Sequence, residues 1–197
     1  GTASFHVTTG GDDDRVIVRR SDNQTTVATS AGNASINVGS NASRLDRIAG
    51  NLRIDSGQGV DVLVVDASGA SSLGVTGAVG SGPATGYTDD ISGFESLADI
   101  DFRGVEHSQL SLGTGDDQPS IESVSAILAL SILSGQGADK IQIGHPSSGL
   151  STIQGIVDIN AGAGTDTLLL VDQDGGGQTK TGVLTDRTIS GFGMGAP

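Results

Sequence analysis

A glycine-centred motif recurs along the chain at two alternating spacings. Each unit has alternating apolar residues on both sides of a turn of the form Gly-x-Gly-x-Asp, as in residues 52–65. The second glycines of successive units lie 22, 27, 56, 22 and 27 positions apart. These glycines are Gly10, Gly32, Gly59, Gly115, Gly137 and Gly164. Because the 22-then-27 pattern occurs twice, each glycine of the first half has a partner 105 residues later, and the chain contains two copies of one repeat.

The residues around these glycines follow the same offset. Residues 36–39 match residues 141–144, and the sequence Ile-Ser-Gly-Phe at 91–94 recurs at 189–192. The last match has an offset of 98 rather than 105, because the second copy lacks seven residues of the segment 66–91. That segment is rich in glycine, and deletions are tolerated in loops, so we expect it to be a loop.

The two copies are expected to form one continuous structure. The first superrepeat covers residues 1–105 and the second covers residues 106–197. The chain starts and stops within the repeat, which indicates a fragment of a longer array.

Alternation of apolar and polar residues predicts the fold. A period of two is typical of strands that turn one face inward. A unit of 22 to 27 residues has room for two or three short strands, which is one coil of a β-helix. The sequence therefore predicts an all-β chain, a parallel β-solenoid of 22–27-residue coils in two superrepeats of about 105 residues. The apolar side chains of the alternation should face inward along its whole length, from Phe5 to Leu170.

Composition limits the classes of function. Aromatic residues make up 3% of the chain, and it has no Trp or Cys, which excludes a disulfide-stapled or zinc-finger design. The net charge of −13 argues against a nucleic-acid partner, which requires clustered Lys and Arg. No apolar run approaches the length of a transmembrane segment, so no membrane insertion is expected.

Aspartate dominates the acidic residues, with 20 Asp against three Glu. Asp favours turns and ligates hard cations such as Ca²⁺, so calcium is a candidate partner. A second interpretation is that the charge keeps a β-rich surface from associating with itself.

Five of the six repeat turns carry Asp at the same motif position, where the sixth turn has Ala34. The aspartates are Asp12, Asp61, Asp117, Asp139 and Asp166. This pattern resembles the RTX (haemolysin-type) calcium-binding repeats. The resemblance implies Ca²⁺ bound between stacked turns, with Asp carboxylates and turn carbonyls as ligands. The chain departs from that family because its motif recurs at much longer spacings than every ninth position, and the leading glycine pair is absent. The alternative is that Asp closes the turn and binds no metal.

Three Asn-x-Ser/Thr sequons lie in the first copy, at Asn23, Asn33 and Asn41. They predict N-glycosylation if the protein is secreted by a eukaryote, and turn residues otherwise. None recurs in the second copy, which argues against a role shared by every repeat.

An enzyme is not expected. Parallel β-helices include pectate lyases and related polysaccharide enzymes, which gather carboxylates with a basic or His partner on one outer face. Here His6, His107 and His145 are scattered along the sequence. The carboxylates follow the repeat, which argues against one unique active site.

These observations favour a structural protein at the cell surface or outside the cell. We expect a stiff rod or filament subunit of an appendage, sheath or adhesin stalk. Its partners would be copies of itself or further repeats, stacked head to tail, and glycans or cell-surface polymers are further candidates. The alternative is a calcium-binding, RTX-like adhesion module, and a polysaccharide lyase or epimerase is the third option.

Overall fold

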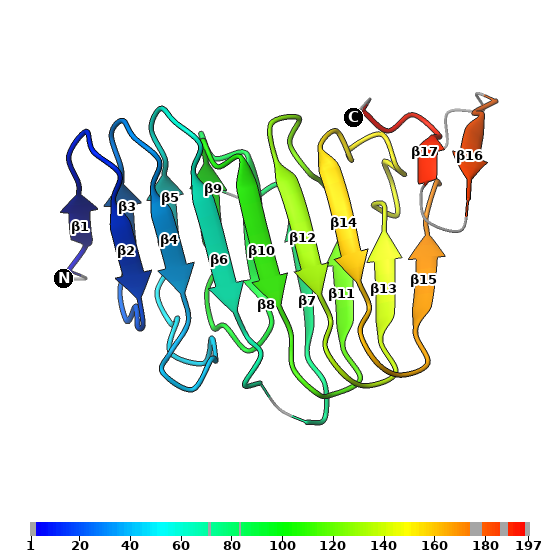
Figure 1. The fold of residues 1–197 in the computed structure, drawn as a ribbon, viewed down its shortest axis with the longest axis horizontal. Helices are drawn as coiled ribbons and strands as arrows, with labels where there is room; N and C mark the ends of the chain where they lie inside the picture. Colours follow the sequence, from blue (N-terminus) through cyan, green and yellow to red (C-terminus); the bar gives the residue numbers. More distant parts are fainter. Residues whose placement is uncertain (1–2, 71, 83, 174–178, 186–188, 196–197) are drawn as a thin grey trace.

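The computed structural model describes residues 3–70, 72–82, 84–173, 179–185 and 189–195, and these residues form strands and turns without a helix (Figure 1). The strands are β1 (Phe5–Thr8), β2 (Arg15–Val18), β3 (Thr25–Ala28), β4 (Ser35–Val38), β5 (Leu52–Asp55), β6 (Val62–Asp66), β7 (Thr76–Gly80), β8 (Asp89–Gly93), β9 (Ile100–Arg103), β10 (His107–Ser111), β11 (Gln118–Ile121), β12 (Ala129–Leu133), β13 (Lys140–Ile143), β14 (Ile156–Asn160), β15 (Thr167–Leu170), β16 (Gly182–Leu184) and β17 (Ile189–Gly191). Among the described residues, no helix is long and apolar enough to span a membrane.

Two large sheets face each other along the length of the molecule (Figure 1). One sheet has nine strands in the order β1-β3-β5-β9-β8-β7-β11-β13-β15, and the other has six in the order β14-β12-β10-β6-β4-β2. Consecutive strands from β1 to β6 alternate between the sheets, and each of β1 to β4 pairs in parallel with the strand two places later. The expected all-β class and parallel strand pairing are therefore confirmed.

The segment 66–91, which we expected to be a loop, contains strand β7 and the start of β8. Both pairings of β8, with β7 and with β9, are antiparallel. The outer two strands of this meander continue the sheet on either side, because β9 pairs in parallel with β5 and β7 with β11. The expectation of a loop was wrong, because glycine in this segment does not always mark a turn. Gly77 lies in a strand, where a Cβ would overlap the ring of Phe94.

The strand register corrects the alignment at the first turn. Phe5 pairs with Thr25, so the first spacing is two positions shorter than the glycines indicate. On the other side of that turn Val16 pairs with Ile36, which pairs with Leu63. The residue equivalent to Asp61 in the first turn is therefore Asp14, and Asp12 lies two positions earlier.

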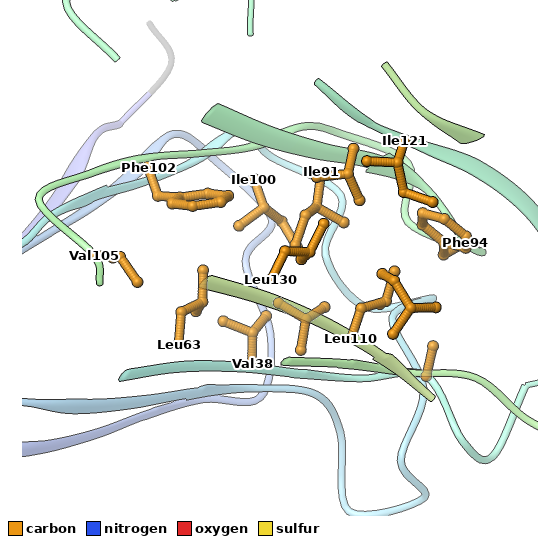
Figure 2. Close-up of a cluster of buried hydrophobic side chains, with 14 of the residues drawn as sticks. Val38, Leu63, Ile91, Phe94, Ile100, Phe102, Val105, Leu110, Ile121 and Leu130 are labelled. Carbon is orange, nitrogen blue, oxygen red and sulfur yellow. The ribbon is translucent and has the colours of Figure 1, made fainter. Parts of the chain in front are cut away.

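The core lies between the two sheets. In Figure 2, Ile100 and Phe102 of the nine-stranded sheet lie across from Leu63 and Leu110 of the other sheet, and all four are fully buried. The inward residues of the middle strands are buried as expected. At the ends the expectation fails: Phe5 is 64% exposed and Leu168 is 50% exposed. Both lie on the outermost strands of the nine-stranded sheet, so they have a neighbouring strand on one side and solvent on the other.

Candidate functional site: aspartate turns and an acidic surface

Three of the motif aspartates immediately precede strands and are buried beneath their turns. Asp61 precedes β6, Asp117 precedes β11 and Asp139 precedes β13, and none of the three is more than 1% exposed. A buried carboxylate needs hydrogen-bond donors to offset the loss of water. Each of these carboxylates finds one in the backbone of a neighbouring turn.

The hydrogen bonds form a ladder along the second copy. The amide of Asp139 donates to Oδ1 of Asp166 at 3.0 Å, and the amide of Asp117 donates to Oδ1 of Asp139 at 2.8 Å. The amide of Val75 donates to Oδ1 of Asp117 at 2.7 Å and continues the ladder into the first copy. Each aspartate of this ladder therefore accepts a hydrogen bond from the turn that precedes the adjacent strand.

A shorter ladder of the same kind lies in the first copy. The amide of Ala34 donates to Oδ1 of Asp61 at 2.7 Å, and the amide of Asp61 donates to Oε2 of Glu106 at 2.8 Å. Glu106 therefore takes the role of a motif aspartate, although it lies outside any Gly-x-Gly-x-Asp sequence. Ala34, which interrupts the motif, provides a donor and no acceptor.

A second set of hydrogen bonds runs in the opposite direction, from the residue before the motif position. The amide of Asn33 donates to Oδ1 of Asp13, and the amide of Val60 donates to Oδ1 of Asn33. In the second copy the amide of Ala138 donates to Oδ1 of Asp116. The acceptor now belongs to the earlier turn, so each turn is tied to both of its neighbours. The sequence reasoning missed this set, although consecutive acidic residues at 116–117 were a visible signal.

The five predicted aspartates do not form a single row. The turns of the first copy lead from the nine-stranded sheet into the six-stranded sheet, whereas those of the second copy lead the other way. Asp61 therefore belongs to one ladder, and Asp117, Asp139 and Asp166 belong to the other. Asp12 is exposed in its turn and takes no part in either ladder.

One carboxylate oxygen remains without a partner at three of these turns. Oδ2 of Asp61, Asp117 and Asp139 is buried and has no hydrogen-bond partner. Burial raises the pKa of all three carboxyl groups, and the amide donor to Oδ1 opposes this shift. Hard oxygen atoms of this kind suit Ca²⁺. Within the described part of the chain, however, no three acidic or His side chains gather in a group that could hold a metal ion.

The sequon residues Asn23, Asn33 and Asn41 all lie in turns and are exposed. At Asn33 the side-chain oxygen is engaged, because it accepts the hydrogen bond from the amide of Val60 at 2.8 Å. Asn33 is therefore a turn-closing residue, whatever its modification state.

An acidic cluster that the sequence did not predict lies on the outer side of β8 and β9 in the nine-stranded sheet. Asp90 and Asp101 lie directly opposite each other on β8 and β9 and are 7% and 0% exposed. The pKa of Asp90 is raised to about 6, mainly by burial and additionally by the neighbouring carboxylates of Asp99, Asp101 and Glu122. The Nε of Arg53 lies 4.0 Å from Asp101 and is the cation of this group.

A pocket of about 390 Å³ lies beside Asp90. Its lining includes Glu122 and His145, whose Nε2 lies 3.9 Å from a carboxylate oxygen of Glu122. The other two His residues lie elsewhere, with His6 on β1 and His107 on β10. Alternation in β8 and β9 would have identified Asp90 and Asp101 as outward-facing, but β8 begins in the glycine-rich segment 66–91 and neither strand was predicted.

Comparison with protein-family models, with curated proteins and with solved structures finds no match.

Proposed function

We propose that this chain is a structural repeat protein of the cell surface or extracellular space, a length of parallel β-solenoid that stacks head to tail into a stiff rod. Such a rod serves as a filament subunit, a sheath component or an adhesin stalk. The proposal assigns no catalytic activity to the chain. Its main support is the complementarity of the two ends of the molecule.

Each end exposes two strand edges and the apolar side chains beside them. At one end β1 and β2 are the outermost strands of the two sheets, with Phe5 64% and Ile17 43% exposed. At the other end the outermost strands are β15 and β14, with Leu168 50% and Ile156 53% exposed. Unpaired edges bind further strands readily, and the apolar side chains add the free energy of burial.

The strand directions allow the two ends to join. The pairing β1–β3 is parallel, and so is the pairing β13–β15. A second molecule whose β1 lies beside β15 therefore extends the nine-stranded sheet in parallel. The interior of the rod would be held by the aspartate ladders, because they tie each turn to its neighbours. The net charge of −13 would oppose side-by-side aggregation of such rods.

Assembly as a function of concentration tests this proposal. Sedimentation velocity should show species that lengthen with concentration, and negative-stain electron microscopy should show unbranched filaments. A double variant, Ile17→Lys with Leu168→Lys, places a charge at each end and should remain monomeric. Leu97→Lys is the matched control, because Leu97 is 76% exposed in a turn away from both ends, and it should assemble like the wild type. A wild-type protein that stays monomeric at all accessible concentrations contradicts the proposal.

The buried Oδ2 atoms of Asp61, Asp117 and Asp139 favour a second candidate function, a calcium-binding adhesion module of the RTX type. Ca²⁺ bound to the folded state would stabilise it by about 2.7 kcal/mol at a concentration 100-fold above Kd. Thermal melting in millimolar CaCl₂ and in EDTA measures this effect. Identical melting curves eliminate the calcium version and leave the rod proposal intact.

A further inference from the structure

The two copies of the repeat use the two sheets in opposite ways. Strands β1, β3 and β5 of the first copy lie in the nine-stranded sheet, whereas their sequence equivalents β10, β12 and β14 lie in the six-stranded sheet. Strands β2, β4 and β6 exchange places with β11, β13 and β15 in the same manner. The cause is the meander: β7, β8 and β9 all remain in one sheet, so a copy that starts in the nine-stranded sheet also ends there. The next copy therefore starts in the other sheet.

The C-terminal hairpin repeats the start of the meander in detail. Gly182 pairs with Gly191 in β16–β17, as Gly77 pairs with Gly93 in β7–β8. The next residue after each hairpin is a Phe in the left-handed region, with φ of 50° at Phe94 and 53° at Phe192. Their amides donate 3.0 Å hydrogen bonds to the equivalent carbonyls of Thr76 and Thr181.

The hairpin is also anchored to its own copy in an equivalent way. The amide of Leu97 donates to the carbonyl of Ile48, and the amide of Gly195 donates to the carbonyl of Ile153, both at 2.9 Å. Figure 1 shows the order β14, β17, β16 along the long axis, which is the order of β5, β8 and β7 in the first copy.

One position differs between the two copies. In the first copy β9 lies between β5 and β8, parallel to the former and antiparallel to the latter. Its inward residues Ile100 and Phe102 are fully buried. Among the described residues, no strand lies between β14 and β17. The side chains that would contact it are only partly covered: Val157 and Ile189 are half-buried, whereas their equivalents Leu52 and Ile91 are 0% exposed.

We propose that β14 and β17 form a slot for one strand with the pattern of β9, supplied by a further copy of this repeat. The inference rests on the proposed head-to-tail stacking and specifies its geometry. The incoming strand places one large apolar side chain, in the position of Ile100, beside Val157 and Ile189, and a second, in the position of Phe102, beside Ile159. Its entry joins β16 and β17 to the six-stranded sheet. Each further copy is then rotated by half a turn about the long axis, and two copies add nine strands to each sheet.

The donors for the incoming strand are defined by the first copy. The amide of Leu52 donates to the carbonyl of Asp99, and the amide of Ser56 donates to the carbonyl of Arg103. The equivalent amides 105 residues later are those of Val157 and Ala161. Both should therefore point into the slot and become protected when it is filled.

A synthetic peptide tests the slot directly. The probe is a fluorescein-labelled peptide of residues 98–105, Ala-Asp-Ile-Asp-Phe-Arg-Gly-Val, added to the protein of residues 1–197. Fluorescence anisotropy should show saturable binding, and the same peptide with Ile100→Ser and Phe102→Ser should bind at least tenfold more weakly. Hydrogen exchange at Val157 and Ala161 should slow when the unsubstituted peptide is bound.

Protein variants place the binding at this end of the molecule. Ile189→Asp introduces a charge into the slot and should weaken peptide binding at least tenfold. Leu97→Lys, in a turn of the first copy away from both ends, should leave it unchanged. If Ile189→Asp lowers the melting temperature, the exchange pattern of the wild type still decides the question.

Three results overturn the slot: no binding of the 98–105 peptide, equal binding of the Ser-substituted peptide, or no protection at Val157 and Ala161. Protection of the Val157 and Ala161 amides by a peptide of residues 3–10, which carries β1, in preference to the 98–105 peptide also overturns it, because the first strand of a second chain would then occupy the slot. Filaments without peptide binding retain the rod and remove the slot. Peptide binding without filaments retains the slot and removes the rod.

Discussion

The backbone amide of Asp117 donates a 2.8 Å hydrogen bond to Oδ1 of Asp139, a residue 22 positions later in the sequence and on the adjacent strand of the sheet. Both carboxyl groups are buried, and burial raises the pKa of each. If Asp139 were needed only for the backbone conformation of its own turn, its effect would be confined to that turn. The hydrogen bond explains more, because it makes the Asp of one turn the cap of another.

Removal of the Asp139 carboxylate should therefore destabilise the fold at a distance in the sequence. Asp139→Ala leaves the buried amide of Asp117 without an acceptor, which costs roughly 1–3 kcal/mol. At about 2–4 °C per kcal/mol for a chain of this size, the melting temperature should fall by several degrees. Asp12→Ala is the matched control, because Asp12 is exposed and takes no part in either ladder, and it should have little effect. Equal losses in the two variants would show that the ladder contributes nothing.

Close approach of adjacent turns makes a second prediction. A Cβ at Gly57 would overlap the carbonyl oxygen of Ser30 in the neighbouring turn, whereas a Cβ at Gly10 would meet no atom within 4 Å. The two residues lie in equivalent turns of the first copy. Gly57→Ala should cost at least about 2 kcal/mol, because the backbone of one turn must move away from the other. Gly10→Ala should be close to neutral. Denaturant unfolding of the two variants measures the difference, and a neutral Gly57→Ala contradicts the close stacking of these turns.

The buried carboxyl group of Asp90, in the acidic cluster of β8 and β9, predicts a pH dependence of the stability. The pKa of Asp90 is about 6 in the folded state and lies near 3.8 in the unfolded chain. Between these values the folded state holds a proton that the unfolded state releases. The corresponding stability is fully present below about pH 4 and is lost as the pH rises through about 6. The charged neighbours of Asp90 are the carboxylates of Asp99, Asp101 and Glu122, and Arg53 lies beside Asp101.

Asp90→Asn should remove this loss, because the amide stays neutral at every pH. The variant should gain stability relative to the wild type as the pH rises from 4 to 7, by up to about 3 kcal/mol, because each unit of pKa difference corresponds to about 1.4 kcal/mol. Thermal melting of both proteins across that range measures the difference and cancels the titration of all other groups. Asp158→Asn, on the exposed face of β14, is the control and should show no such trend. A difference between Asp90→Asn and the wild type that is constant with pH contradicts the prediction.

The sequence predicted those parts of the fold that its alternation expresses locally. Strands such as β4 and β6 could be read from alternating Ile, Val and Leu, and parallel pairing followed from the repetition of one unit. The role of Asp139 as a turn residue was also foreseen, but its hydrogen-bond partner was not. That partner depends on which turns become neighbours in space.

The meander could not be predicted in the same way. Gly77 reads as a loop residue, although it stands in a strand because the ring of Phe94 occupies the space of a side chain. The exchange of sheets was equally hidden. The offset of 105 residues shows which residues of the two copies are equivalent. It does not show how many strands lie between them, and that number decides in which sheet the second copy begins. The pairing of Asp90 with Asp101 could not be predicted either, because it depends on β8 and β9, which the sequence did not indicate.

Disulfide cross-linking at the junction of the two copies tests the half-turn between them. The chain has no cysteine, so each introduced pair reports alone. Neighbouring strands lie about 4.8 Å apart, which is within the Cα separation of about 4.4–6.8 Å that a disulfide allows. Val64 and Gln109 are paired on the outer face of the six-stranded sheet, one from each copy. Ala78 and Ser120 are paired on the outer face of the nine-stranded sheet.

Without the half-turn, β10 would occupy the place of β11 and Gln109 would lie beside Ala78. The most direct measurement is therefore the rate of disulfide formation in three double-cysteine variants under mild oxidation. We expect rapid closure for Val64→Cys with Gln109→Cys and for Ala78→Cys with Ser120→Cys, and none for Ala78→Cys with Gln109→Cys. Closure of the last pair, together with failure of the first, would contradict it.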